Sequence, residues 1–142
     1  MNNDLLSIAV KYAKEAASQG GYPFGAVVTN DGKIIGDSRR RTITFGALNH
    51  AEINAIINAC ENTKKNDLTG CVIYSSCQPC ELCMGAIKWI GIREVHYAMD
   101  MADAKSAGLE EVFAPDFARI TEHKILNEDL IAFMKKWYDA KV

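Results

Sequence analysis

The sequence has no long hydrophobic run, no internal repeat and no low-complexity stretch. No segment approaches the roughly 18 consecutive apolar residues of a membrane helix. The N-terminal stretch up to Gly21 mixes apolar positions with an acidic residue and lysines, a pattern typical of an amphipathic helix and not of a signal peptide. We therefore expect a cytoplasmic protein with no membrane partner.

A surplus of basic residues is also absent. The 142 residues include 16 Lys and Arg against 18 Asp and Glu, which gives a formal net charge of −2. Proteins that bind nucleic-acid backbones usually present an excess of positive charge. The charge therefore argues against a nucleic-acid partner, although Arg39, Arg40 and Arg41 form one local basic run.

The cysteines do not suit a disulfide framework, because their number, five, is odd and no export signal precedes them.

Hydrophobic residues make up 49% and charged residues 24% of the chain, as in ordinary globular proteins. A chain of this length closes one core. We therefore expect residues 1–142 to form a single domain.

Hydrophobic periodicity predicts an alternation of helices and strands. A first helix should end at Gly20-Gly21, and Asn30-Asp31-Gly32 should form the turn of a β-hairpin. We predict helices at 5–16, 50–59, 80–90 and 127–138, and strands at 26–29, 33–36, 71–75 and 94–98. Residues 99–121 give no clear pattern. This order indicates an α/β domain with helices on both faces of one sheet.

Two short segments have the residue types of a zinc site. His50 opens one predicted helix, and Cys80 and Cys83 follow Pro79 in the first turn of the next. Residues three apart on a helix share a face, and the positive end of the helix dipole favours thiolates. A catalytic zinc ion keeps three protein ligands and a water. We therefore predict that His50, Cys80 and Cys83 bind Zn²⁺.

Glu52 lies two residues after His50, so the two side chains leave the helix on different faces. A carboxylate beside the metal can take a proton from the bound water and pass it to a leaving amine. The metal itself lowers the pKa of that water toward neutrality. We predict that Glu52 is the catalytic acid and base.

Each half of this pattern has other interpretations. A C-x-x-C alone suits a redox pair or half of a structural zinc site, and His96 or Cys71 could supply a fourth ligand. Both of those residues, however, lie among apolar neighbours in predicted strands. The combination of His-x-Glu with Pro-Cys-x-x-Cys is far more specific, and it is the signature of zinc deaminases.

The segments PFGAVV, NHAEINAI, CVIYSSCQPCELCMGAIKW and DAKSAGLEE resemble the cytidine/deoxycytidylate deaminase superfamily. The similarity is to the branch of guanine deaminases, fungal-type cytosine deaminases and tRNA adenosine deaminases. It implies a three-layer α/β/α fold with a five-stranded mixed sheet. It also implies one Zn²⁺ per chain and hydrolytic release of ammonia from a free nucleobase or related amino-heterocycle. Guanine is the leading candidate.

The resemblance also assigns four residues to the substrate pocket. Phe24 and Trp89 match aromatic residues that flank a flat ring, and Ala51 lies between a metal ligand and Glu52. Glu111 matches an acid that faces the purine, and a carboxylate suits the N–H donors of guanine. Trp89 could equally be a core residue, and Glu111 could belong to a solvated acidic pair.

One stretch departs from the family pattern. The family usually has an asparagine in the loop before the His-x-Glu helix, whereas residues 38–42 read Ser-Arg-Arg-Arg-Thr and the next asparagine is Asn49. Arginine offers donors only. This leaves open another ring, such as cytosine, isocytosine, a pterin or a triazine. A tRNA adenosine deaminase and a non-catalytic zinc domain are further alternatives.

The C-terminal helix carries apolar residues at Leu130, Ile131, Phe133 and Met134, which suit either a core or a dimer interface. The resemblance implies a homodimer. In guanine deaminases the C-terminal segment exchanges between subunits and brings an aromatic residue near the pocket, a role that Trp137 or Tyr138 could take.

Overall fold

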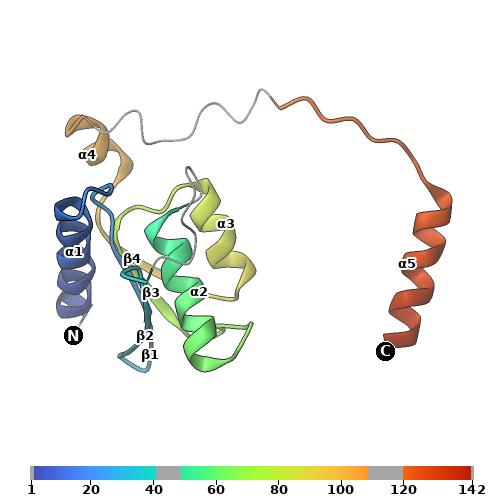
Figure 1. Ribbon diagram of the computed structural model, residues 1–142, viewed down its shortest axis with the longest axis horizontal. Coiled ribbons are helices and arrows are strands. Elements are labelled where there is room, and N and C mark those ends of the chain that lie inside the picture. Colours follow the sequence, from blue (N-terminus) through green and yellow to red (C-terminus); the bar gives the residue numbers. More distant parts are fainter. Residues whose placement is uncertain (1, 41–48, 109–119, 142) are drawn as a thin grey trace.

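A four-stranded sheet with helices on both faces forms the body of the protein in the computed structural model (Figure 1). The structure describes residues 2–40, 49–108 and 120–141. The helices are α1 (Asn2–Ser18), α2 (Ala51–Thr63), α3 (Glu81–Trp89), α4 (Met101–Ser106) and α5 (Glu128–Lys141), and the strands are β1 (Ala26–Asn30), β2 (Lys33–Asp37), β3 (Val72–Cys77) and β4 (Glu94–Met99). Helix α1 covers one face of the sheet, and α2 and α3 cover the other. The predicted three-layer α/β/α arrangement is therefore confirmed.

The strand order is β2-β1-β3-β4. Strand β1 pairs antiparallel with both β2 and β3, whereas β3 and β4 are parallel and are joined through α3. The predicted hairpin turn is present, with positive φ angles of 50° at Asp31 and 78° at Gly32. Two such residues in succession are typical of the tight turn that matches the twist of an antiparallel pair.

The central strands β1 and β3 are buried on both faces of the sheet, and most of their residues are apolar. On one face, Val27 and Tyr74 pack against Ala9 of α1. The opposite face of the sheet packs against α2 and α3, in a core that comprises Ala26, Val28, Ala51, Ala55, Ile56, Ala59, Leu68, Cys71, Ile73, Ile87 and Ile92. This second core supports the N-terminal ends of α2 and α3, where the predicted metal ligands lie.

Asparagines on α2 pair with the open edge of the sheet. The backbone N–H of Asp37 donates to Asn58 Oδ1 at 3.0 Å, and Asn62 Nδ2 donates to the carbonyl of Ile35 at 2.9 Å. Both backbone groups belong to β2, which is the edge strand. Because an edge strand exposes unpaired polar groups, these side chains fix β2 against α2.

The sheet has four strands within the described residues, not the five that the resemblance implied. After β4 the chain turns at Asp100, whose side chain accepts from the backbone N–H of Asp103, and Asp103 in turn accepts from the backbone of Asp100. This capping box starts α4 and directs the chain out of the sheet. Residues 109–119 lie outside the described part, and residues 120–127 have no regular secondary structure.

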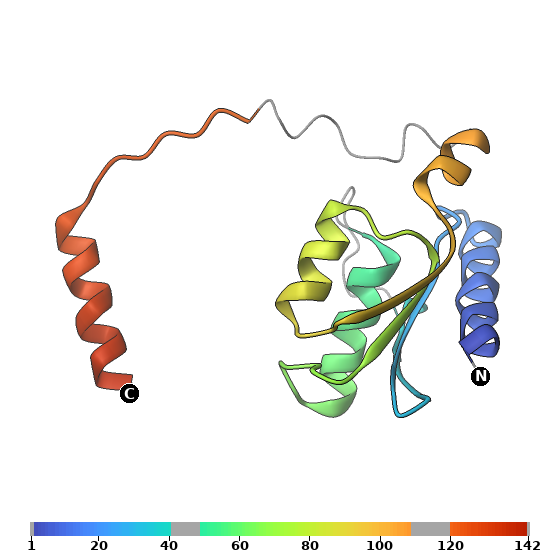
Figure 2. The same cartoon turned by 180° about the vertical axis from the view of Figure 1, so that it is seen from behind.

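Helix α5 stands apart from the sheet in both views (Figures 1 and 2). The sequence predicted a helix at 127–138, and α5 occupies 128–141, with the Asn127 side chain accepting from the backbone N–H of Leu130 at 2.8 Å. None of its described residues is buried. Among the described helices, none has the length and apolar character required to cross a membrane.

Candidate metal centre

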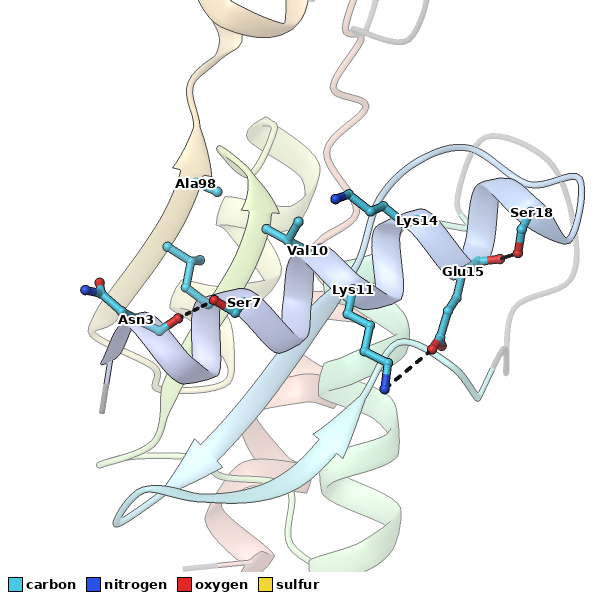
Figure 3. A pocket seen from close by; sticks show the side chains of 9 residues that line it. Asn3, Ser7, Val10, Lys11, Lys14, Glu15, Ser18 and Ala98 are labelled. Atoms are coloured by element: carbon cyan, nitrogen blue, oxygen red, sulfur yellow. Dashed lines mark hydrogen bonds and ion pairs between the residues drawn. The ribbon is translucent and has the colours of Figure 1, made fainter.

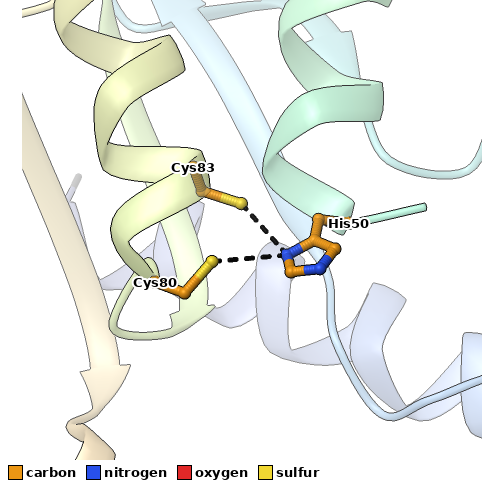
Figure 4. Close-up of side chains that lie close together, drawn as sticks. All are labelled: His50, Cys80 and Cys83. Carbon is orange, nitrogen blue, oxygen red and sulfur yellow. Dashed lines mark hydrogen bonds between the residues drawn. The ribbon is translucent and has the colours of Figure 1, made fainter. Parts of the chain in front are cut away.

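The N-terminal ends of α2 and α3 bring the three predicted metal ligands together. His50 is the residue that precedes α2, Cys80 precedes α3, and Cys83 lies in the first turn of α3. Cys80 is thus a cap residue, just outside the helix in which it was predicted. The imidazole of His50 points at both sulfurs (Figure 4), with Nδ1 3.5 Å from Cys80 Sγ and 3.3 Å from Cys83 Sγ.

These distances fit a zinc ion. Typical Zn–N and Zn–S bonds at a tetrahedral angle place the nitrogen about 3.6 Å from each sulfur. The three ligand atoms also lie within 4.8 Å of one another. Within residues 2–40, 49–108 and 120–141 this is the one group of at least three potential ligands close enough to hold an ion. His96 stacks on Tyr74 and Cys71 belongs to the core, so neither joins the group.

The two thiols have opposite acidities without a metal. The neighbouring Cys83 side chain, together with nearby His50, lowers the pKa of Cys80 to about 4. The neighbouring Cys80 sulfur and burial raise the pKa of Cys83. The metal-free site therefore holds one thiolate and one thiol, and a bound metal would require the Cys83 proton to leave.

Glu52 is buried beside these ligands. It lies in the first turn of α2 with 5% of its surface exposed. The Ser75 hydroxyl donates to Oε1, and the Cys83 thiol donates to Oε2 at 3.3 Å. Burial raises the pKa of Glu52, and the bond from Ser75 opposes that rise. The carboxyl group is therefore fixed in orientation and adapted to exchange a proton.

A cavity of about 520 Å³ adjoins the start of α2. Its walls include Phe24, Ser38, Asn49, Ala51 and Asn54, together with residues at the end of α1. Asn49 and Ala51 flank His50 in the chain, so the cavity passes directly beside a metal ligand. Such a volume is within the usual range for small-molecule sites.

The comparisons with known proteins agree with this geometry. The protein-family model that describes the cytidine and deoxycytidylate deaminase zinc-binding region matches residues 1–99. The chain belongs to the cytidine and deoxycytidylate deaminase family.

Individual relatives in this deaminase family have different substrates. Guanine deaminase from Bacillus subtilis (strain 168) is 40% identical over 116 residues, which cover 80% of this chain and 74% of the relative. A solved structure of guanine deaminase from B. subtilis superposes with a TM-score of 0.80 at 31% identity and covers 96% of this chain and 93% of its own. The tRNA-specific adenosine deaminase of Agrobacterium fabrum (strain C58) is 33% identical over 106 residues, 74% of this chain and 68% of the relative.

The predicted pocket residues of this deaminase fall into two groups. Phe24 and Ala51 lie on the wall of the same cavity. Trp89 ends α3, about 13 Å along the helix axis from Cys80, and its side chain is 93% exposed. The structure therefore does not bring Trp89 to the metal ligands within the described chain. Glu111 lies outside the described residues.

The arginines that replace the family's asparagine have other partners. The Arg39 guanidinium donates to the Asp37 carboxylate at 2.9 and 3.2 Å and lies 4.5 Å from the centroid of the Tyr12 ring. Arg40 pairs with Glu61 at 3.1 Å. Arg41 is outside the described part of the chain. The first two arginines thus join the loop to neighbouring elements.

A roomier hollow, of about 820 Å³, lies along α1 (Figure 3) and shares no lining residue with the cavity beside His50. Leu6, Val10 and Lys14 of α1 and Ala98 of β4 line part of it. None of its lining residues is a metal ligand, and it is the more open of the two hollows.

Sequence reasoning missed Ser75, Asn49 and Asn54. Ser75 and Asn54 are 1% and 2% exposed. Their signal is a polar residue at an inward position of an otherwise apolar strand or helix, which requires a partner. The partner, however, comes from another element, which the local pattern does not identify.

Proposed function

We propose that this protein hydrolyses the amino group from a free nucleobase or a related amino-heterocycle, and that guanine is the first substrate to test. The observation that carries the proposal is the position of Glu52. Its carboxyl group is buried, is oriented by Ser75 and contacts the ligand Cys83. A proton-transferring group is thereby held beside the metal ligands, and its chain neighbour Ala51 lines a cavity of suitable size.

The residues divide the chemistry among them. His50, Cys80 and Cys83 would hold one Zn²⁺ per chain, which when bound makes a water available as a nucleophile at neutral pH. Glu52 takes a proton from the attacking water and delivers it to the departing amine, so that ammonia leaves. Phe24 and Ala51 line the space for the ring, and Trp89 and Glu111 stay predicted contacts.

The charge and the relatives favour a small substrate. The net charge of −2 gives little attraction for a phosphate backbone, and the guanine deaminase of B. subtilis has the higher identity of the two relatives described above. Cytosine, isocytosine, pterin and triazine rings are the alternatives for the same site. A tRNA adenosine deaminase and a non-catalytic zinc domain are further ones.

The decisive experiment measures ammonia release by zinc-loaded protein from guanine, isocytosine, cytosine, adenine, a pterin and an amino-triazine. Glu52→Gln keeps the shape of the side chain but cannot take the proton, so we expect a loss of roughly 10²- to 10⁴-fold. Its zinc content should equal that of the wild type. No release from any free ring would contradict the proposal. Inosine formation in a tRNA would favour the tRNA adenosine deaminase. Inactivity on free rings and on tRNA would favour the non-catalytic zinc domain.

We also propose that the protein is a homodimer. The apolar side chains of α5 have no cover within the described chain, and all its residues are exposed. A second copy is the simplest partner for an interface that the chain itself carries.

A further inference from the structure

Three asparagines spaced four residues apart lie along one side of α2. Asn58 and Asn62 bind the backbone of β2. Asn54, one turn nearer the metal centre, is 2% exposed, and its Nδ2 donates to Oδ1 of Asn49 at 2.6 Å. Asn54 therefore serves a different purpose from the two asparagines below it, because it orients another amide group.

The oriented amide belongs to the residue that immediately precedes the metal ligand His50. Asn49 is half-buried, and both Asn49 and Asn54 line the cavity that also contains Phe24 and Ala51. Asn49 uses its carbonyl oxygen to accept the bond from Asn54. Within residues 2–40, 49–108 and 120–141, no hydrogen bond uses the Asn49 NH₂ group, which retains two donors.

The other described side chains that line the cavity offer fewer donors. Tyr22 and Ser38 each have a single hydroxyl donor, and Asn54 already gives one N–H to Asn49. Arg39 and Arg40 pair with Asp37 and Glu61 and are not among the lining residues. Among the described lining residues, Asn49 is therefore the amide next to His50 in the chain that keeps both N–H donors.

We propose that Asn49 is a specificity-determining residue, and that its NH₂ group donates to an acceptor atom of the substrate ring, either a carbonyl oxygen or an unprotonated ring nitrogen. Asn54 is its positioning residue. The proposal rests on the proposed deaminase function. It assigns to Asn49 the amide contact with the substrate ring, because residues 38–40 contain no amide side chain.

The test compares kcat and KM of Asn49→Ala, Asn49→Asp and Asn54→Ala on the ring that the wild type deaminates fastest. Loss of a hydrogen bond to the substrate should lower kcat/KM of Asn49→Ala roughly 10-fold, mainly through KM. Asn49→Asp should lose at least as much, because it presents acceptors to an acceptor. Asn54→Ala should lose less. The double variant Asn49→Ala/Asn54→Ala should be no worse than Asn49→Ala, since both changes remove one interaction.

Asn62→Ala is the matched control, because it removes an asparagine from the same side of α2 but away from the cavity. It should leave kcat/KM unchanged. Zinc content and thermal unfolding of each variant show whether it is folded, and Asn49→Ser replaces Asn49→Ala if the latter is not. A kcat/KM for Asn49→Ala within roughly twofold of the wild type, or an Asn49→Asp more active than Asn49→Ala, would overturn the proposal. An inactive wild type would instead contradict the proposed function.

Discussion

Ser75 is the buried hydroxyl group that sets the orientation of Glu52. It donates to Oε1, while the Cys83 thiol contacts Oε2. Because the Ser75 bond opposes the effect of burial on the pKa of Glu52, its removal should raise that pKa further. The carboxylate form, which accepts the proton, would then require a higher pH.

We therefore expect Ser75→Ala to lower kcat roughly 10-fold and to move the acidic side of the pH–kcat profile to higher pH. Ser75→Thr keeps the hydroxyl group and should restore most of both. Ser76→Ala is the control, since the Ser76 hydroxyl accepts from the backbone N–H of Gly25 and not from the site. An unchanged pH profile in Ser75→Ala would show that the hydroxyl does not influence Glu52.

The unequal thiols give a second prediction at this scale, on proton release. With the pKa of Cys80 lowered to about 4 and that of Cys83 raised, the metal-free site at pH 7 has one thiolate and one proton to lose. Zinc binding should release about one proton from the thiols, so zinc affinity should rise with pH. Calorimetric titration in two buffers of different ionisation enthalpy measures the number. Release of two protons or none would be inconsistent with this assignment.

Individual residues differ in how far the sequence could identify them. His50, Cys80 and Cys83 were predictable because zinc requires a few residue types at restricted spacings. Ser75 was not, because it meets Glu52 across 23 positions of sequence, and a serine in a strand has many possible partners. Asn49 became informative only once the structure placed Asn54 against it.

At the level of elements, close packing of α2 against β2 depends on a glycine. A Cβ on Gly36 would lie 2.6 Å from the Ala55 carbonyl oxygen and even closer to the Ala59 backbone nitrogen. Both obstacles are helix backbone, which cannot move without shifting α2. In contrast, a Cβ on Gly85 in α3 meets no described atom within 4 Å apart from its chain neighbours and the backbone of its own helix.

We expect Gly36→Ala to reduce the free energy of unfolding by about 1–3 kcal/mol, as overpacking does, and to weaken zinc binding because α2 carries His50. Gly85→Ala should instead increase the free energy of unfolding by about 0.5–1 kcal/mol, since alanine favours a helix. Urea unfolding measures this free energy for both variants. A Gly36→Ala protein as stable as the wild type would mean that α2 and β2 are not in such close contact.

The positions of the elements were more predictable than their ends. Periodicity located every described helix except α4, and every described strand. Strand β3, however, continues to Cys77, because its backbone pairs as far as Cys77 opposite Met99. Side-chain hydrophobicity does not report such backbone pairing, so the polar residue Ser76 hid the last two residues of the strand. Helix α4 is short and depends on a capping box instead of an apolar face.

At the scale of the whole molecule, α5 is a helix without a surface to cover it. Its apolar residues occupy a continuous side of the helix, and they are 51–64% exposed: Leu130, Ile131, Phe133, Met134, Trp137 and Tyr138. An isolated helix of 14 residues is marginally stable in water, and an apolar surface of this kind usually marks an interaction site.

If a second copy covers this surface, the protein should sediment at about twice the 15.7 kDa of one chain. Replacing Phe133 and Trp137 together by aspartate would place two charges in the apolar interface and should yield a monomer. Ala132→Asp, on the polar side of α5, is the matched control and should remain dimeric. Sedimentation velocity over a range of concentrations distinguishes the three proteins. A monomeric wild type, or a dimeric double variant, would show that α5 does not mediate dimer formation.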